Sequence, residues 1–243
     1  MPVRYPNIES LAADLAAGRR TSQQLTEAAL TRAQDPASEG ARVFTLIDAE
    51  RARAAAQASD TLRAVGIVRS PLEGLPVSVK DLFDVAGQVT TSGSVVLKDA
   101  PPAERNAPVI DRLIAAGAVI VGRTNMTEFA FSGLGLNPHY GTPKNPWDRV
   151  DGGRIPGGSS SGAAVSVTDG MAVVGIGSDT GGSVRIPSAL CGLTGFKPTQ
   201  RRVPTEGALP LSTSLDSIGP LAASVRCCAI GDAILAGEPP TVP

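Results

Sequence analysis

The sequence is poor in the residue types that bind metals and stack on nucleic-acid bases. It has one histidine, His139, and three cysteines, so it cannot supply the several closely spaced ligands that a zinc site needs. Five Phe, two Tyr and one Trp are too few for an aromatic platform that stacks bases. We therefore expect no metal, no other cofactor and no direct binding of nucleic acid.

Long apolar runs and an excess of one charge are also missing. The formal net charge is −1, without a Lys/Arg cluster, whereas nucleic-acid-binding proteins usually show a basic excess. No stretch approaches the ~18 apolar residues of a membrane span, and the first ten residues lack an apolar signal segment. These absences predict a cytoplasmic protein that does not insert into a membrane.

The three cysteines, Cys191, Cys227 and Cys228, do not suggest a disulfide framework. Two of them are adjacent, and the count is odd. We expect all three to be reduced and structural.

Apolar residues make up 42% of the 243 residues, enough for the core of one large domain or two small ones. Apolar spacing, capping residues and glycine stops predict helices and strands that alternate along the chain. Such alternation is typical of an α/β fold with a mostly parallel sheet. The expected helices cover 8–17, 22–34, 48–65, 109–116, 125–131 and 162–168, and the expected strands 75–79, 118–121 and 171–176.

Two runs rich in Gly and Ser flank the last of these strands: PGGSSSG at 156–162 and GSDTGGSVR at 177–185. Glycine lets backbone N–H groups approach a ligand without a Cβ in the way. Such a concavity favours an anion or the developing oxyanion of acyl transfer. One run alone would be read as a surface turn, but two runs joined by one strand favour a functional site.

Three catalytic or cofactor motifs can be compared with these runs. Residues 158–162, GSSSG, match the G-x-S-x-G nucleophile elbow, but that family places its histidine after the serine and His139 comes before it. The glycines at 175, 177 and 181 do not have the G-x-G-x-x-G spacing of a dinucleotide loop. The S-x-x-K motif of penicillin-recognising enzymes is absent.

A serine hydrolase without a usable histidine needs another base, and a lysine serves if burial keeps it neutral. Lys80 ends the apolar strand LPVSVK, whereas Lys197 is followed by Arg201 and Arg202 and is expected closer to the surface. From the residues alone, Lys80 could equally be an exposed lysine at the end of a strand.

Three segments together resemble the amidase signature family, which includes bacterial amidases, the A-type chain of glutamyl-tRNA amidotransferase and fatty acid amide hydrolase. They are LPVSVKDLFDVAG, PGGSSSGAA and GSDTGGSVRIPSALCGLTGFKPT. The resemblance implies one amidase-signature domain over 1–243, with N-terminal helices at about 7–66 and a catalytic core at about 71–223. It implies a mixed, mostly parallel central sheet with helices on both faces, and a chain that lacks the C-terminal part of the family fold.

The resemblance also implies a catalytic triad. Ser183 corresponds to the acyl nucleophile, Ser159 to a bridging serine in a cis peptide, and Lys80 to the base. The implied reaction is hydrolysis of a carboxamide C–N bond through an acyl-enzyme, with a small-molecule carboxamide as substrate. An A-type amidotransferase subunit and a non-catalytic scaffold subunit stay open as alternatives, as do a homodimer and a partner subunit.

Further positions follow from the same resemblance. The backbone of Thr180, Gly181, Gly182 and Ser183 corresponds to the oxyanion hole. A weaker correspondence assigns Ala130, Phe131, Ser132 and Gly133 to the substrate-binding pocket. We expect Asp179 and Arg185 to hold the shape of the loop by hydrogen bonds or an ion pair.

Overall fold

A computed structural model describes residues 7–150 and 152–240, which build a mixed six-stranded sheet in the order β1-β3-β2-β4-β6-β5. The strands are β1 (Phe44–Ile47), β2 (Pro76–Lys80), β3 (Val119–Thr124), β4 (Val174–Asp179), β5 (Thr194–Gly195) and β6 (Ser217–Ala222). Strand β2 is parallel to both β3 and β4, whereas the pairs β1–β3, β4–β6 and β5–β6 are antiparallel. The expected mixed sheet is confirmed, but its parallel part is limited to the three central strands.

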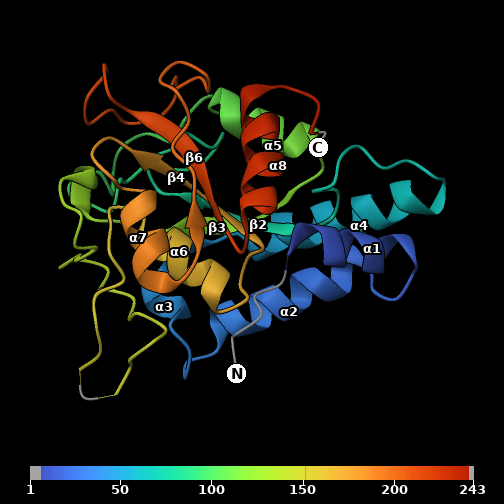
Figure 1. Cartoon of the computed structure of the whole chain (residues 1–243), viewed down its shortest axis with the longest axis horizontal. Helices are drawn as coiled ribbons and strands as arrows, with labels where there is room; N and C mark the ends of the chain where they lie inside the picture. The colour runs from blue at the N-terminus through green and yellow to red at the C-terminus, as the bar shows by residue number, and fades with distance from the viewer. Residues whose placement is uncertain (1–6, 151, 241–243) are drawn as a thin grey trace.

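Helices cover both faces of this sheet, as expected (Figure 1). They are α1 (Ile8–Ala16), α2 (Ser22–Gln34), α3 (Gly40–Val43), α4 (Ala49–Ala64), α5 (Pro108–Ala115), α6 (Ser161–Thr168), α7 (Arg185–Cys191) and α8 (Val225–Ala236). One apolar core joins α1, α5 and α8 to the sheet, and a second joins α2, α4 and α6 to its other face. None of the helices in the described ranges combines the length and the apolar character that crossing a bilayer requires.

A local signal explains where α2 starts, and one expected helix does not form. Helix α2 is capped by Thr21 in a capping box with Gln24, one residue before the expected cap. The helix expected at 125–131 reduces to a 3-10 turn, Glu128–Ala130, and its expected cap, Thr124, is the last residue of β3. Phe129 and Ala130 have φ values of 50° and 60°, which a right-handed α-helix cannot contain.

Six elements lie where none was expected: α3, β1, α7, β5, β6 and α8. Strand β1 precedes α4, so the N-terminal region is not purely helical, and α8 follows the expected end of the core at 223. Four residues of β1 are too short a run to give a clear period. Strand β4 ends at Asp179, three residues later than predicted, so the first residues of the second Gly/Ser run are paired with β6.

Candidate active site

Lys80 is the last residue of β2, and its side chain is fully buried. Side chains alternate along a strand, so Val77 and Val79 enter the core with α5 and α8 while Ser78 and Lys80 face α6. Lys80 Nζ donates to Ser159 Oγ at 2.7 Å and to Ser178 Oγ at 2.8 Å. The alternative of an exposed lysine at the end of a strand is therefore wrong.

The charge state of Lys80 follows from these surroundings. Among the described residues, no carboxylate lies within ion-pair distance of its Nζ. Burial lowers the pKa of Lys80 to about 7, because Asp179 and Asp216 offset only part of the desolvation. Near neutral pH, a substantial fraction of this lysine is an uncharged amine that can accept a proton.

Ser159 is held at the start of α6 by the first Gly/Ser run. The Gly158–Ser159 peptide bond is cis, the form that the resemblance implies for the bridging serine. A Cβ on Gly158 would lie 2.6 Å from Gly135 N and 2.7 Å from Thr127 Oγ1, so no other residue fits there without a rearrangement. Thr127 N also donates to Ser159 O at 3.1 Å. The backbone around Ser159 is therefore tightly packed.

Ser183 lies between β4 and α7, and its backbone contacts the first Gly/Ser run. Its carbonyl accepts from Ser160 N at 3.2 Å, which joins the two Gly/Ser runs. Its side-chain oxygen makes no hydrogen bond with another described residue. The structure thus links Lys80 directly to Ser159, but it leaves the step from Ser159 to Ser183 without a hydrogen bond. Catalytic hydrogen bonds are often long before a substrate is bound.

Asp179 and Arg185 hold the second Gly/Ser run, as expected. Asp179 accepts from Gly182 N at 2.7 Å and from Val184 N at 3.1 Å, and Arg185 Nε donates to it at 2.9 Å. Burial raises the pKa of Asp179, but the Arg185 guanidinium and the backbone amides outweigh this and lower the pKa below its usual value. Asp179 is therefore an anion that fixes the loop.

These contacts change the expected set of oxyanion donors. The N–H of Gly182 already donates to Asp179, so it is engaged within the loop. The N–H groups of Thr180, Gly181 and Ser183 make no hydrogen bond with another described residue. A Cβ built on Gly181 would meet nothing within 4 Å, so this position is open. Three of the four expected amides are free to receive a ligand oxygen.

The four residues assigned to the substrate pocket lie in different surroundings. Ala130 lines a cavity of about 70 Å³ together with Ser178 and Leu209. Phe131 is 82% exposed, and Gly133 O accepts from Gly158 N at 2.8 Å. Ser132 Oγ accepts from Leu134 N at 3.1 Å. Of the four, Ala130 is the one that borders this cavity.

Sequence reasoning missed two groups in this region. Ser178 is the second hydroxyl partner of Lys80, and Asp216 accepts a hydrogen bond from Thr180 Oγ1. Ser178 could have been found from the sequence, because it lies in the second Gly/Ser run, directly before Asp179 at the end of β4. Asp216 lies in a different segment of the chain, and nothing in its local sequence links it to Thr180.

Two other side chains that were considered as bases are bound elsewhere. Lys197 Nζ donates to Leu215 O at 2.9 Å and to Ser217 Oγ at 3.1 Å, and its side chain is 23% exposed. His139 Nε2 lies 3.0 Å from Glu128 Oε1 in the long loop. Lys197 is closer to the surface than Lys80, as expected, and His139 anchors its loop.

Cysteine and acidic side chains are the other groups in the described part of the chain that could supply a reactive thiol or a metal site. All three cysteines are buried, and burial raises the pKa of the Cys191 and Cys228 thiols to about 12. Such thiols stay protonated at neutral pH. In residues 7–150 and 152–240, no group of three His, Cys, Asp or Glu side chains is arranged to hold a metal ion.

A family model described as Amidase matches residues 24–241, and this range contains all three side chains of the site. The chain belongs to the Amidase family. The resemblance to amidase signature proteins is thereby confirmed.

Relatives of this Amidase-family chain include two enzyme subunits. It is 44% identical over 230 residues to AtzE, a subunit of 1-carboxybiuret hydrolase from Pseudomonas sp. (strain ADP), covering 94% of this chain and 49% of that protein. It is 46% identical over 229 residues to the A-type chain of the glutamyl-tRNA(Gln) amidotransferase of Anaeromyxobacter sp. (strain K), covering 94% of this chain and 45% of that protein.

The same fold occurs in a solved peptide amidase from Stenotrophomonas maltophilia. That structure superimposes with a TM-score of 0.87 at 35% identity, covering 98% of this chain and 49% of the other. The chain therefore spans about half the length of the relatives it matches.

Proposed function

We propose that this chain carries the acyl-transfer site of an enzyme that hydrolyses carboxamides, with Ser183 as nucleophile, Ser159 as proton relay and Lys80 as base. The observation that carries the proposal is the environment of Lys80. Its amine is fully buried, lies 2.7 Å from Ser159 Oγ and has a pKa of about 7. A lysine with these properties can accept a proton near neutral pH.

In the first half-reaction, Ser183 Oγ attacks the carboxamide carbon. Its proton passes to Ser159 Oγ, whose own proton passes to Lys80 Nζ. A hydroxyl can relay in this way because it donates and accepts at once. When the C–N bond breaks, the proton on Lys80 returns through Ser159 to the leaving nitrogen. Water then attacks the Ser183 ester by the reverse route and releases the carboxylic acid.

Negative charge develops on the carbonyl oxygen during both attacks. We assign the N–H groups of Thr180, Gly181 and Ser183 as its donors, because the N–H of Gly182 is bound to Asp179. Removing one oxyanion donor from a hydrolase typically costs about 3 kcal/mol of transition-state stabilisation. The ion pair of Asp179 with Arg185 supports this function by holding the three amides in place.

Labelling with a fluorophosphonate tests the proposal. We expect a single adduct, located on Ser183 by intact mass and peptide mapping, with no adduct in Ser183→Ala and slow labelling in Lys80→Ala. Ser161→Ala is the matched control, because its buried hydroxyl lies in the same Gly/Ser run as Ser159 and has no hydrogen-bond partner among the described residues. Its labelling should equal that of the unaltered chain. Absence of any adduct would favour the non-catalytic scaffold.

A second candidate is the A-type chain of an amidotransferase, in which the released ammonia passes to an acceptor on a partner protein. The 46% identity to the corresponding chain of a glutamyl-tRNA(Gln) amidotransferase supports it. Ammonia release from a panel of carboxamides separates the two candidates. A free-standing hydrolase turns over one of them alone, whereas an amidotransferase chain is acylated once and needs its partner for turnover.

A further inference from the structure

The peptide group that joins Asp179 to Thr180 is hydrogen-bonded at its carbonyl and free at its N–H. Lys197 Nζ donates to Asp179 O, whereas the N–H of Thr180 makes no hydrogen bond with another described residue. This peptide bond is trans, so its carbonyl and its N–H point in opposite directions. A side chain that fixes this carbonyl therefore also fixes the direction of an N–H that we assign to the oxyanion.

The other anchor of the second Gly/Ser run does not reach this peptide. The carboxylate of Asp179 accepts from three backbone amides, and all three follow Gly181 in the chain. The pairing of β4 with β6 also ends at Asp179. Between these supports the chain passes through Thr180 and two glycines, and glycine has the widest backbone freedom. The direction of the Thr180 N–H therefore depends on contacts from outside this run.

Lys197 supplies such a contact and is itself held at three points. Besides Asp179 O, its Nζ donates to Leu215 O at 2.9 Å and to Ser217 Oγ at 3.1 Å. A lysine ammonium has three N–H groups, and these three oxygens offer an acceptor to each of them. Asp179 is the last residue of β4 and Ser217 the first of β6. The ammonium therefore ties the ends of these two strands together.

The surroundings of Lys197 let it keep its proton where Lys80 loses it. Burial lowers the pKa of Lys197 and Arg185 adds to this shift, but Asp179 and Asp216 oppose it. Asp179 Oδ1 lies 3.9 Å from Nζ, and the side chain of Lys197 is 23% exposed. Among the described residues, the fully buried Lys80 has no carboxylate at this distance. We therefore treat Lys197 as a cation at neutral pH.

Thr180 has a second support through its side chain. Thr180 Oγ1 donates to Asp216 Oδ1, and Asp216 Oδ2 accepts from Leu211 N at 2.9 Å and from Ser212 N at 3.0 Å. Asp216 is thus fixed by the backbone of its own segment. The residue that carries the free N–H is held at its hydroxyl as well as at the preceding carbonyl.

We propose that Lys197 is a positioning residue of the oxyanion hole, which holds and polarises the peptide between Asp179 and Thr180, with the Thr180–Asp216 hydrogen bond as a second support. The inference rests on the proposed function, in which this N–H receives the carbonyl oxygen of the substrate. A charged donor makes a stronger hydrogen bond than a neutral one, and hydrogen bonds in a chain polarise one another. The Thr180 N–H thereby becomes a better donor to the charge that develops in acyl transfer.

NMR of the full chain tests the contact without relying on activity. A chain with 13C at the backbone carbonyl of aspartate and 15N in threonine gives carbonyl–amide signals from Asp-Thr pairs alone, which are Asp60–Thr61 and Asp179–Thr180 in this sequence. Lys197→Met keeps the length of the side chain but has no donor. We expect it to shift the Asp179 carbonyl carbon and the Thr180 amide proton, because the hydrogen bond to that carbonyl is lost.

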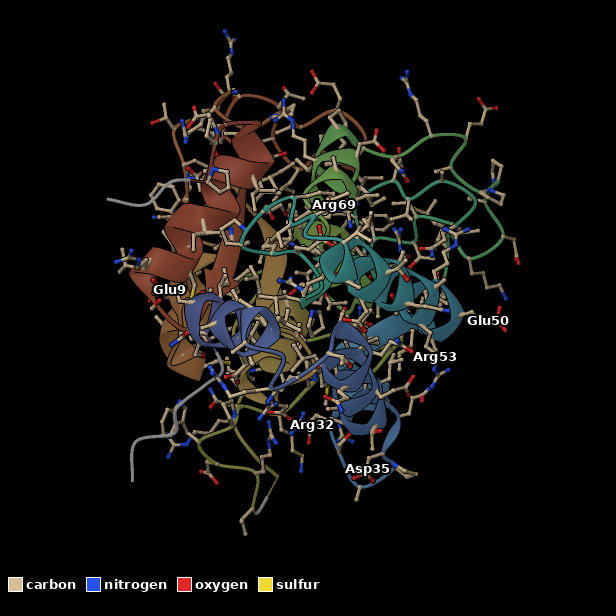
Figure 2. The ribbon with its side chains drawn as sticks, turned by 90° about the vertical axis from the view of Figure 1, so that its right-hand side faces the viewer. Glu9, Arg32, Asp35, Glu50, Arg53 and Arg69 are labelled. Carbon is tan, nitrogen blue, oxygen red and sulfur yellow. The ribbon has the colours of Figure 1, made fainter. Side chains whose placement is uncertain are left out.

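The pair Asp60–Thr61 is the internal reference. It lies in α4, which packs against α2 and β3 and carries Glu50 and Arg53 on its outer surface (Figure 2). Its signal should be the same in the variant and in the unaltered chain. An Asp179–Thr180 signal that does not move would show that Lys197 does not orient this peptide, and would overturn the proposal. If both signals move because Lys197→Met does not fold, Thr180→Val decides.

Rates of fluorophosphonate labelling test the consequence for Ser183. Lys197→Met should lower the level rate above pH 7 about tenfold, less than the roughly 10²–10³ lost when an oxyanion donor is removed. The midpoint of the pH–rate profile should stay in place, because burial and two carboxylates set the pKa of Lys80. Lys197→Arg keeps the charge and the donors and should recover part of the rate.

Two further variants complete the comparison. Lys144→Met is the matched control, because Lys144 Nζ also donates to a backbone carbonyl, Arg149 O at 3.5 Å, in the long loop before the first Gly/Ser run. Its rate should equal that of the unaltered chain. Thr180→Val removes the bond to Asp216 but keeps that carboxylate, so it should slow labelling up to about tenfold with the same midpoint.

The outcomes separate this proposal from the proposed function. An unchanged rate in Lys197→Met, or in Thr180→Val where that variant decides, would overturn the positioning role. A midpoint that moves in Lys197→Met would also overturn it, because Lys197 would then act through Lys80. If the unaltered chain is not labelled at all, the proposed function fails, and the NMR comparison still decides whether Lys197 fixes this peptide.

Discussion

Lys80 and Arg123 are two buried basic side chains on neighbouring parallel strands, but only Arg123 is paired with a carboxylate of a described residue. Both are almost completely inaccessible, at 0% and 1% exposed. Lys80 Nζ is surrounded by hydroxyl and carbonyl oxygens of Ser159 and Ser178, whereas Arg123 Nε is bonded to the carboxylate of Asp81. They also face opposite sides of the sheet.

This difference separates a base from a permanent cation. A buried ammonium without a carboxylate loses much of its preference for the proton, which is why the pKa of Lys80 falls to about 7. A guanidinium stays protonated in proteins, and its carboxylate partner makes burial tolerable. The same depth of burial therefore gives, in our proposal, proton-transfer chemistry on one face, and a fixed ion pair on the other.

The largest expected effect comes from removing the base. Lys80→Met should slow fluorophosphonate labelling of Ser183 by about 10³-fold, because a positioned general base contributes roughly 10²–10⁴ in rate. Lys80→Arg should be equally slow, since its side chain keeps the charge but cannot accept a proton. Second-order labelling rates measure this. A rate within tenfold of the unaltered chain in either variant would show that another group takes the proton.

Breaking the ion pair between Arg123 and Asp81 should lower the stability of the fold. Asp81→Asn leaves Arg123 buried without its counter-charge and should lower the free energy of unfolding by about 3–5 kcal/mol. Asp14→Asn is the control, because Asp14 pairs with Arg19 on the surface and should cost at most about 1 kcal/mol. Urea denaturation compares the two variants. Equal losses would mean that the buried pair has no special role.

The two cations should also differ in the pH dependence of stability. Between pH 7 and 10.5, the unfolded chain holds a proton on Lys80 that the folded chain has largely lost, so native stability rises with pH. Lys80→Met removes this dependence. We therefore compare the free energy of unfolding of Lys80→Met with that of the unaltered chain. The value for the variant minus the value for the unaltered chain should decrease by about 1.4 kcal/mol per pH unit in this window. A difference that does not change with pH would mean that Lys80 keeps its proton after folding.

The smallest effect is expected at Ser178, which positions the amine of Lys80. Ser178→Ala removes one acceptor from Nζ and should slow labelling about tenfold, as expected for the loss of one hydrogen bond. Because that hydroxyl stabilises the charged amine, the midpoint of the pH–rate profile should also move below that of the unaltered chain. A slower rate with an unchanged midpoint would indicate a purely structural role.

The central features of the fold could be predicted from the sequence, because they depend on local patterns. The apolar run before Lys80, the glycine stops of the helices and the spacing of the two Gly/Ser runs are all visible in the chain. Strand β1 was not predicted because its four residues are too few to show a period. Strand β6 was not predicted because its sequence, SIGPLA, contains Gly and Pro, which usually mark a break in a strand. The same holds for the 3-10 turn at Glu128–Ala130, where positive φ values replace a helix.

In the candidate site, too, the residues in local sequence motifs could be predicted, whereas contacts that depend on the folded path of the chain could not. Lys80, Ser159 and Ser183 lie in motifs that can be read from the chain, and so does the ion pair of Asp179 with Arg185. The engagement of Gly182 N–H by Asp179 depends on the path of the loop, and the contact of Thr180 with Asp216 joins segments 36 residues apart. Neither could be derived from residue types.

The pH dependence of Ser183 labelling tests the central claim most directly. The account predicts that the second-order rate for a fluorophosphonate rises with one ionisation, has its midpoint at about pH 7 and is level above it, because only the neutral amine of Lys80 accepts the proton. A midpoint near 10.5, the ordinary value for lysine, or a rate that does not depend on pH, would contradict it.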